Sequence, residues 1–416
     1  MQSKTVLLAS IAVILFILIY GYPIFRCLWW ILEHFISKTW YFYFICIAVP
    51  LLFQVFILIC TAVGFLVRSI KVRYFMYLVI DYISFDFPFL FLIIICEFIF
   101  DFSSAAHKYA WIVCISLVSL VLIYIILAHL NGVLILRKKK VNLKSSKLKQ
   151  PLRIIQISDV HIGSRSTKFL NRVVKQVNIL EGDIVCVTGD LVDISGVVRQ
   201  NVDSDGQNPY PAMQPLANIT AKCGVYLVMG NHDFVSGGKS FVKMIQHFPN
   251  VRLLQNEYID VSLQQSAQSN QTDKQIRIVG IEDGDVYEFT GEVNNLQSSN
   301  SSLFINETSD SPYTILLHHR PHDEAWLTAL NALKGDLFLA GHTHNGQIFP
   351  WHPLIYHWFS HPYGLLSVPA SVVQQGNGGF NSFDRHMYVN PGTGSWGTPA
   401  RTSGFGEITI ITVFPE

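Results

Sequence analysis

Charged residues are scarce in this chain. Lys, Arg, Asp and Glu make up only 14% of its 416 residues, whereas half of the residues are hydrophobic and the mean hydropathy is +0.34. Disordered chains have the opposite composition, and a collagen-like chain needs glycine at every third position. A chain as apolar as this is not a single soluble globular protein, so we expect a membrane protein that carries a water-facing domain.

Cysteine is also scarce. The seven cysteines are scattered, and no two of them have CxxC spacing. This pattern excludes a disulfide framework, a zinc ribbon and a thioredoxin-like redox site. The chain also lacks a GxSxG motif, and neither Cys186 nor Cys223 has a base beside it in the sequence. Catalysis by a nucleophilic serine or cysteine therefore has little support.

The charges divide the chain into two parts. Residues 1–150 contain 14 Lys and Arg but 5 Asp and Glu, whereas residues 151–416 contain 16 and 24. The acidic second part argues against nucleic-acid binding. We expect a transmembrane region over residues 1–136, a basic juxtamembrane linker over 137–150 and a water-facing domain over 151–416.

Four apolar runs each cover the roughly 20 residues that a membrane-spanning helix requires. These runs are Thr5–Leu28, Tyr41–Val67, Tyr74–Phe100 and Ala110–Leu136. Most Lys and Arg of the connecting segments fall on one side of them, namely Lys4, Arg68, Lys71, Arg73 and residues 137–140. Only Lys38 and Lys108 fall on the other. We therefore expect a multi-pass protein with a cytoplasmic domain, its basic linker either lying along an anionic leaflet or acting as a stop-transfer flank.

Two features leave alternatives open. Asp81 and Asp86 interrupt the third apolar run, and intramembrane carboxylates favour a functional pathway, although a kink near Pro88 would let them face a neighbouring helix. Asn-x-Ser/Thr triplets, such as that at Asn218, would suit a domain outside the cell. Lys and Arg asymmetry is the stronger evidence and favours the cytoplasm.

The second half has the pattern of an α/β domain. Short β-branched runs predict strands at 153–157, 183–188, 224–229, 275–281, 313–317, 336–340, 387–389 and 407–413. Helical periodicity appears between them at 167–180, 241–248 and 323–333. Two polar stretches, 262–275 and 292–311, have little apolar content and are interpreted as surface insertions.

Polar clusters follow five of these strands directly. The clusters are Ser158 to His161, Gly189 to Asp193, Gly230 to Asp233, His318 to Pro321 and Gly341 to His344. Open α/β sheets bind ligands beyond the carboxyl ends of their strands, where all five clusters fall. In an extended chain residues i and i+2 point the same way, so we expect Asp159 and His161 to reach one ion.

Carboxylate, imidazole and amide donors without thiolate suit Mn²⁺, Fe²⁺ or Zn²⁺. Two such ions can share a water molecule and stabilise in-line displacement at phosphorus. A carboxylate between the ions would reduce their repulsion, and Asp190, after the Gly189 turn, is the candidate. The five clusters together predict a dinuclear metal site.

The motif order DxH, GDxxD, GNHD, His and GHxH resembles that of the calcineurin-like metallophosphoesterases, over about residues 152–413. The resemblance implies a β-sandwich flanked by helices, here preceded by four transmembrane helices. It assigns one metal to Asp159, His161, Asp190 and His344, and the other to Asp190, Asn231, His342 and His319 or His318, with His319 favoured. His318 is otherwise a candidate substrate residue.

The resemblance also implies catalytic roles. His232 would contact the phosphoryl oxygen or protonate the leaving group, and Asp233 would orient it. Asp193 has two possible interpretations, as a residue of the site or as a carboxylate that caps a helix. The final motif, Gly341 to Ile348, resembles that of a branch of the family in which it reads GHTHGGQI. Asn345 stands where that branch has glycine, and asparagine tolerates the left-handed backbone of that turn.

A glycine-rich segment, Gly392 to Gly397, fits GxGxxG by spacing. Pro399 and Gly404 break the helix that a dinucleotide site needs, so we interpret it as an active-site loop that brings Arg401 near the phosphate. The expected function is hydrolysis of a phosphate ester or pyrophosphate, with lipid-linked compounds among the candidate substrates and membrane lipids as partners. The alternative is a membrane protein that uses the domain as a phosphate-sensing or scaffolding module without hydrolysis.

Overall fold

The computed structural model describes residues 21–66, 89–193, 195–199, 209–263, 275–283, 311–322, 326, 329–330, 333–349, 351–368 and 385–416. The chain forms two compact units, Met1–Leu130 and Asn131–Glu416. We call them unit 1 and unit 2.

Unit 1 is helical in its described part. Residues 21–35 and 89–102 are helical, and the elements α2 (Trp40–Leu66), α4 (Ser104–His107) and α5 (Ala110–Leu134) complete it. Arg26 pairs with Glu97 at 2.8 Å between the first two of these helical segments. Within the described residues, two helices are long and apolar enough to cross a membrane, Trp40–Ile59 and Ala110–Leu134.

These two helices lie in the second and fourth of the expected spans. Most of the first and third expected spans lie outside the described residues, as do Asp81 and Asp86. The structure therefore supports two candidate spans and does not support four.

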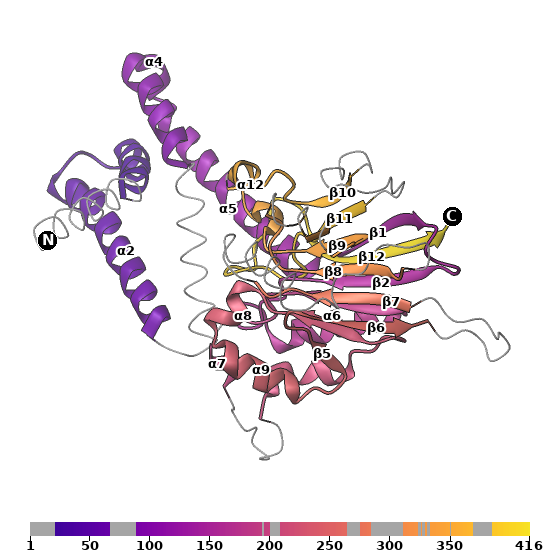
Figure 1. Cartoon of the computed structure of the whole chain (residues 1–416). Helices are drawn as coiled ribbons and strands as arrows, with labels where there is room; N and C mark the ends of the chain where they lie inside the picture. Colours follow the sequence, from indigo (N-terminus) through magenta and orange to yellow (C-terminus); the bar gives the residue numbers. More distant parts are fainter. Residues whose placement is uncertain are drawn as a thin grey trace, which may run out of the picture. The chain divides into compact units, whose positions relative to one another are not determined.

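Unit 2 contains two six-stranded sheets (Figure 1). The first has the order β1-β12-β2-β3-β4-β5, with bounds Leu136–Ser145, Gly406–Pro415, Leu152–Ile157, Ile184–Thr188, Val225–Val228 and Val251–Leu253. The second has the order β10-β11-β9-β8-β7-β6, with bounds Gly364–Val368, Arg385–Val389, Leu337–Ala340, Tyr313–Leu317, Gln275–Gly280 and Glu257–Ser262. Neighbours from β2 to β5 are parallel, as are β7, β8, β9 and β11.

The two sheets share one apolar core. Ile154 and Ile184 from the first sheet belong to the same buried cluster as Ile278 and Leu339 from the second. The outer face of the first sheet is covered by α6 (Thr167–Ile179), α9 (Gly238–Gln246) and the 3-10 helix η1 (Pro211–Asn218). Apolar residues around Trp326 and Leu330 cover the second sheet. Unit 2 is therefore a mixed α/β fold in which two packed sheets are flanked by helices.

All eight expected strands are present, and most bounds shift by one or two residues. Four strands are additional: β1, β5, β6 and β10. The helix expected at 323–333 and both polar stretches lie largely outside the described residues.

Strand β1 corrects the expected linker. Residues 136–145 pair with β12 along ten positions, so the basic segment is part of the sheet. Val141 and Leu143 are buried, whereas Asn142 and Lys144 are exposed. This alternation of buried and exposed residues explains why the segment forms a strand, because it buries one face against the core. The preceding run of Lys hides the alternation in the sequence.

Candidate metal centre

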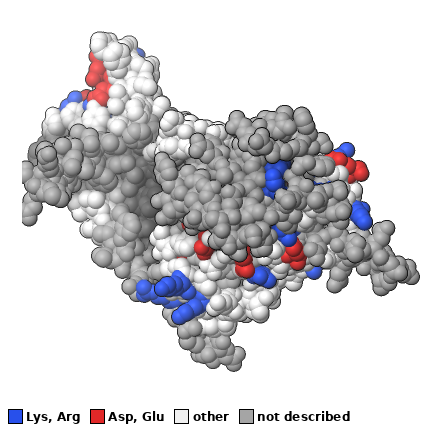
Figure 2. All heavy atoms as spheres, in the orientation of Figure 1, with Lys and Arg blue, Asp and Glu red and all other residues white. Residues whose placement is uncertain are grey.

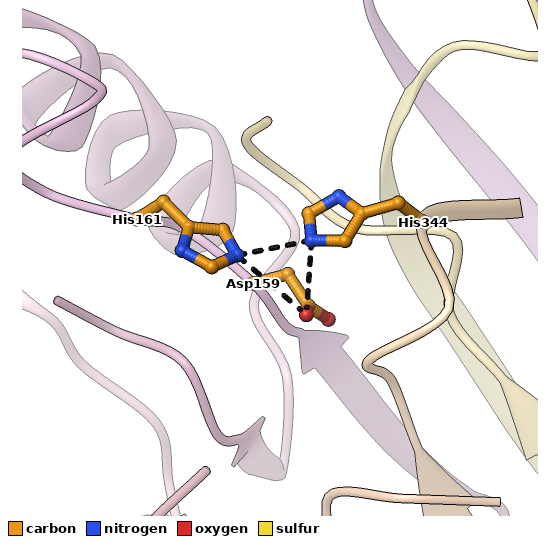
Figure 3. Close-up of side chains that lie close together, drawn as sticks. All are labelled: Asp159, His161 and His344. Carbon is orange, nitrogen blue, oxygen red and sulfur yellow. Dashed lines mark hydrogen bonds and ion pairs between the residues drawn. The ribbon is translucent and has the colours of Figure 1, made fainter. Parts of the chain in front are cut away.

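The polar clusters that follow the strands converge on one site in unit 2. In its first part, His344 Nε2 lies 3.3 Å from Asp159 Oδ1 and 3.0 Å from His161 Nε2. Asp159 and His161 follow β2, whereas His344 begins the 3-10 turn η2 (His344–Gly346) after β9 (Figure 3). All three side chains are buried. We call this group the first cluster.

The second cluster comprises Asp190, His319 and His342. His319 Nε2 lies 3.1 Å from Asp190 Oδ2 and 3.2 Å from His342 Nδ1. Asp190 Oδ2 is also 3.8 Å from His161 Nε2. Its carboxylate therefore lies between the two clusters, in the position expected of a bridging ligand.

The backbone at these side chains is unusual. Five candidate ligands have positive φ: Asp159 at 52°, His161 at 53°, Asp190 at 51°, His342 at 72° and His344 at 50°. Left-handed backbone is uncommon for residues other than glycine, although Asp and His adopt it more often than most, and such conformations cluster at functional sites. The expectation that Asp159 and His161 converge because the chain is extended there is therefore wrong. They meet because the chain curls in the left-handed region, not because it is extended.

Backbone hydrogen bonds between neighbouring loops hold these conformations. Asp159 N donates to Gly189 O, and His161 N donates to Asp190 O, both at 3.0 Å. A Cβ atom on Gly230 would lie 2.2 Å from Asp190 Oδ1, so this close approach requires glycine. The strand ends are thus locked together at the site.

Asn231 lies beside the second cluster. The adjacent His232 N donates to Asp190 Oδ1 at 2.8 Å, which places this turn against the bridging carboxylate. Asn231 Oδ1 is buried and has no hydrogen-bond partner among the described residues. A buried amide oxygen without a donor is costly, and a cation would satisfy it. The residues present therefore fit a metal ion on this side of Asp190.

The electrostatics of the site favour cations. Burial opposes charge on Asp190, but His319 and His161 outweigh it and lower the pKa of Asp190 to about 2. Burial likewise opposes charge on His319, yet Asp190 raises the pKa of His319 to about 10. The carboxylates therefore stay charged and attract positive charge strongly, as metal ligands must.

His319 and His318 point in different directions. His319 joins the second cluster, and its Nδ1 lies 2.8 Å from Thr188 O. His318 Nδ1 lies 3.3 Å from Ile281 O, and its ring contacts that of Phe338. Burial lowers the pKa of His318 to about 3, so this ring is neutral. The structure thus favours His319 for the metal and gives His318 a place in the core, and no contact among the described residues supports a role of His318 in substrate binding.

Asp193, and not Asp233, contacts the candidate acid. His232 Nδ1 lies 2.8 Å from Asp193 Oδ1, and His161 Nδ1 lies 3.3 Å from the same atom. Ser164 also donates its hydroxyl hydrogen bond to Asp193. Both carboxylate oxygens of Asp193 are therefore engaged with residues of the site, which favours its interpretation as a site residue over that as a helix cap.

Asp233 has the structural role. It lies in the first turn of α8 (Asn231–Val235), and its carboxylate accepts hydrogen bonds from Gly230 N at 2.9 Å and Val192 N at 3.0 Å. It therefore caps the helix and ties it to the loop after β3. Burial, together with the repulsion of Asp190, raises the pKa of Asp233 to about 7.

Arg401 also differs from expectation. Its side chain is 1% exposed, and Nη2 donates to Gly394 O at 2.6 Å and Pro391 O at 2.8 Å. Nη2 also lies 3.3 Å from His344 Nδ1. Arg401 therefore holds the glycine-rich loop and a candidate ligand in place, and its hydrogen bonds to carbonyl oxygens favour this supporting role over direct contact with phosphate. Asn345, at φ 49°, has the left-handed backbone expected of it.

Residues 152–346 match the calcineurin-like phosphoesterase family. The match begins at β2 and ends at η2, so it includes both clusters. These residues form a calcineurin-like phosphoesterase domain. The α/β fold and the candidate ligand clusters of unit 2 agree with this family, which implies a dinuclear metal centre.

Other proteins share this phosphoesterase domain. The chain is 30% identical over 270 residues to a transmembrane protein with metallophosphoesterase domain from Bos taurus, covering 62% of this chain and 52% of that protein. It is 28% identical to an uncharacterized metallophosphoesterase from Helicobacter pylori, covering 65% and 62%. The chain thus spans between half and two thirds of these relatives. Among solved structures it is similar to NAD nucleotidase from Haemophilus influenzae, at a TM-score of 0.34 and 12% identity, covering 58% and 45%.

Proposed function

We propose that this chain is a membrane-anchored, dinuclear-metal phosphoesterase that hydrolyses a phosphate ester or pyrophosphate, with a lipid-linked compound as substrate. The observation that carries the proposal is the position of Asp190 between two groups of buried ligands. The first ion would be held by Asp159, His161, Asp190 and His344, and the second by Asp190, Asn231, His319 and His342. Mn²⁺, Fe²⁺ or Zn²⁺ suits these nitrogen and oxygen donors.

When bound, the two ions supply an activated water molecule and neutralise charge on the phosphoryl oxygens. The protein supplies the geometry and the proton. His232 has a side chain 25% exposed and its Nδ1 bound to Asp193, which leaves Nε2 to protonate the leaving oxygen. Asp193 fixes the orientation and tautomer of that imidazole. Arg401 keeps the ring of His344 in place from behind.

Membrane anchoring rests on two apolar helices and on the relative from Bos taurus, whose name describes a transmembrane protein. The cytoplasmic placement of unit 2 rests on the Lys and Arg asymmetry around the apolar runs.

The direct test is metal depletion and restoration. The full chain, purified in mild detergent, is stripped of metal and assayed with Mn²⁺, Fe²⁺ or Zn²⁺ on substrates from p-nitrophenyl esters to lipid-linked pyrophosphates. We expect restored turnover with at least one metal. A chain that binds both ions and hydrolyses none of these substrates would contradict the proposal and favour a sensing module.

A matched pair of variants separates metal chemistry from charge alone. Asp190 follows β3, whereas Asp183 precedes the same strand and bonds Arg153 N at 2.7 Å and Lys222 Nζ at 2.8 Å. We expect Asp190→Asn to lose metal and turnover. Asp183→Asn keeps an oxygen for Arg153 N and is expected to retain both. Equal activity of the two variants would contradict the role of Asp190.

A further inference from the structure

A patch of exposed aromatic and apolar side chains lies beside the metal centre. We call it the aromatic patch; its members are Phe349, Trp351, Leu354, Tyr356, Trp358 and Trp396, between 43% and 66% exposed. Four of them lie in or next to α12 (His352–Trp358), a helix with no buried residue. Large apolar side chains gathered on a surface mark an interaction site.

The patch is connected to the candidate catalytic residues. The Trp396 ring lies 5.7 Å from that of His232. Tyr356 donates its hydroxyl hydrogen bond to Asn345 Oδ1 at 3.2 Å, next to the candidate ligand His344. Gln347 joins the two parts of the patch, because its Nε2 donates to Trp396 O and its Oε1 accepts from Trp396 N. Whatever covers the patch therefore lies close to His232 and Asn345, beside the candidate metal centre.

The composition of this segment suits a membrane interface. No Asp, Glu, Lys or Arg occurs between His344 and Asp384, a run of 39 residues in a chain that is 14% charged. Trp and Tyr are enriched at the level of lipid headgroups, where the ring is in an apolar layer and its polar atom in water.

The C-terminal end of the candidate span α5 and the aromatic patch contact the same loop. Residues 131–134, which end α5, belong to unit 2. Asn131 Nδ2 donates to Arg401 O and Gly404 O, both at 3.0 Å, and a Cβ on Gly132 would lie 1.8 Å from Pro399 O. The same loop accepts a hydrogen bond from Phe349 N through Thr402 Oγ1 at 2.6 Å. The last turn of α5 and the patch are thus joined through residues 396–404.

The helix α5 is longer than the hydrocarbon core of a bilayer is thick. Its 25 residues extend about 38 Å, compared with about 30 Å for the hydrocarbon core. The last turn of a spanning α5 therefore lies among the headgroups. That turn binds the loop that holds Phe349, so the patch lies in the part of unit 2 that the chain enters from α5.

Basic side chains lie on the same edge of unit 2. Arg199, Lys239 and Lys243 are exposed around α7 (Ser195–Val198) and α9, where Figure 2 shows Lys and Arg gathered. We call these three residues the basic corner. Beside it, Val235 of α8 is 84% exposed. Figure 1 shows α7, α8 and α12 along one edge of unit 2. Basic and apolar side chains together are typical of surfaces that bind anionic lipids.

We propose that the aromatic patch and the basic corner dock unit 2 on an anionic bilayer surface, so that the metal centre acts on phosphate groups within the headgroup layer. This inference rests on the proposed function for its substrate class, a phosphoester carried by a membrane lipid. The docking itself does not depend on turnover.

The test is a depth measurement on the full chain. A fluorophore is attached at Leu354→Cys, in a background that carries Cys60→Ser, Cys96→Ser and Cys223→Ser, and the protein is reconstituted in phosphatidylcholine vesicles with about one third phosphatidylglycerol. Spin-labelled phospholipid is the quencher. The matched control carries the fluorophore at Lys144→Cys, an exposed position of β1 near the edge where Figure 1 places the C-terminus.

We expect about threefold stronger quenching at position 354 than at position 144. Trp351→Ser combined with Trp358→Ser, and separately Lys239→Gln combined with Lys243→Gln, should each lower the quenching at position 354. Equal quenching at both positions, or quenching unaffected by either pair of substitutions, would overturn the docking. Circular dichroism and metal content show that each variant is folded. Because quenching needs no turnover, failure of the docking is distinguishable from failure of the phosphoesterase proposal.

Discussion

The metal centre and the aromatic patch are neighbours in unit 2, but their side chains are held in opposite ways. Asp159, Asp190 and His319 are at most 2% exposed and are fixed by contacts between loops that follow different strands. Trp351 and Trp358 are exposed, and α12 buries no residue. The metal centre, which we propose performs the chemistry, therefore depends on the fold. The patch, which we propose places that chemistry at a membrane surface, has side chains that can change without cost to the fold.

The largest expected effect comes from adjacent histidines. His319→Ala should lower turnover by about 10³-fold, because a metal ligand contributes several kcal/mol to transition-state stabilisation. His318→Ala removes a core side chain, so it should lower the free energy of unfolding by about 2 kcal/mol and leave turnover per folded molecule unchanged. Turnover, metal content and thermal unfolding of both variants test this. Equal loss of turnover in both would remove the distinction drawn between the two histidines.

A second pair of substitutions separates the orientation of His232 from the capping of α8. Asp193→Asn should lower kcat by about 10- to 100-fold with both ions retained, because the carboxylate that orients His232 is lost. Asp233→Asn weakens the start of α8 and should lower the free energy of unfolding by about 1 kcal/mol. Steady-state kinetics and chemical denaturation give these values. The account would be wrong if Asp233→Asn lowered kcat more than Asp193→Asn.

Arg401→Met tests the support behind the first cluster. The buried carbonyl oxygens of Pro391 and Gly394 would lose their donor, so the free energy of unfolding should fall by about 3 kcal/mol. Metal affinity should fall as well, since His344 loses its neighbour. If the main effect were a raised KM with unchanged stability, Arg401 would bind substrate after all.

The smallest effect is expected in the patch. Trp358→Ser should change turnover of a soluble p-nitrophenyl ester less than twofold, and the free energy of unfolding by less than about 0.5 kcal/mol, as for most surface substitutions. Kinetics in detergent and thermal unfolding measure both. A large loss on the soluble ester would place this side chain in the metal centre and end the contrast between the two regions.

The sequence predicts most of the metal centre, for a physical reason. Polar residues that directly follow buried strands meet at one edge of a sheet, so Asp159, Asp190 and His342 are visible in the pattern. The direction of side chains in turns is not visible. His232 and Asp233 are adjacent in sequence, but successive helical residues point about 100° apart, so Asp233 turns back to cap α8 while Asp193 reaches His232 from another loop.

Burial and strand pairing were also beyond the sequence. Arg401 follows a glycine-rich loop, and nothing in that spacing distinguishes a guanidinium bound to carbonyl oxygens from one that faces substrate. The Lys run in β1 hides a strand whose partner, β12, lies about 270 residues later. The aromatic patch had one signal, the absence of charge between His344 and Asp384. The absence of charge shows that this segment is uncharged, but it does not show where the segment lies in the fold.

We propose above all that Asp190 joins two metal ions. The most direct measurement is metal content by mass spectrometry, together with anomalous diffraction at the metal edge, for the wild-type chain and for Asp190→Asn. The account predicts two ions in the wild type, one at Asp159, His161 and His344 and one at Asn231, His319 and His342, and the loss of at least one in the variant. A single ion in the wild type, or two ions retained without Asp190, would contradict it.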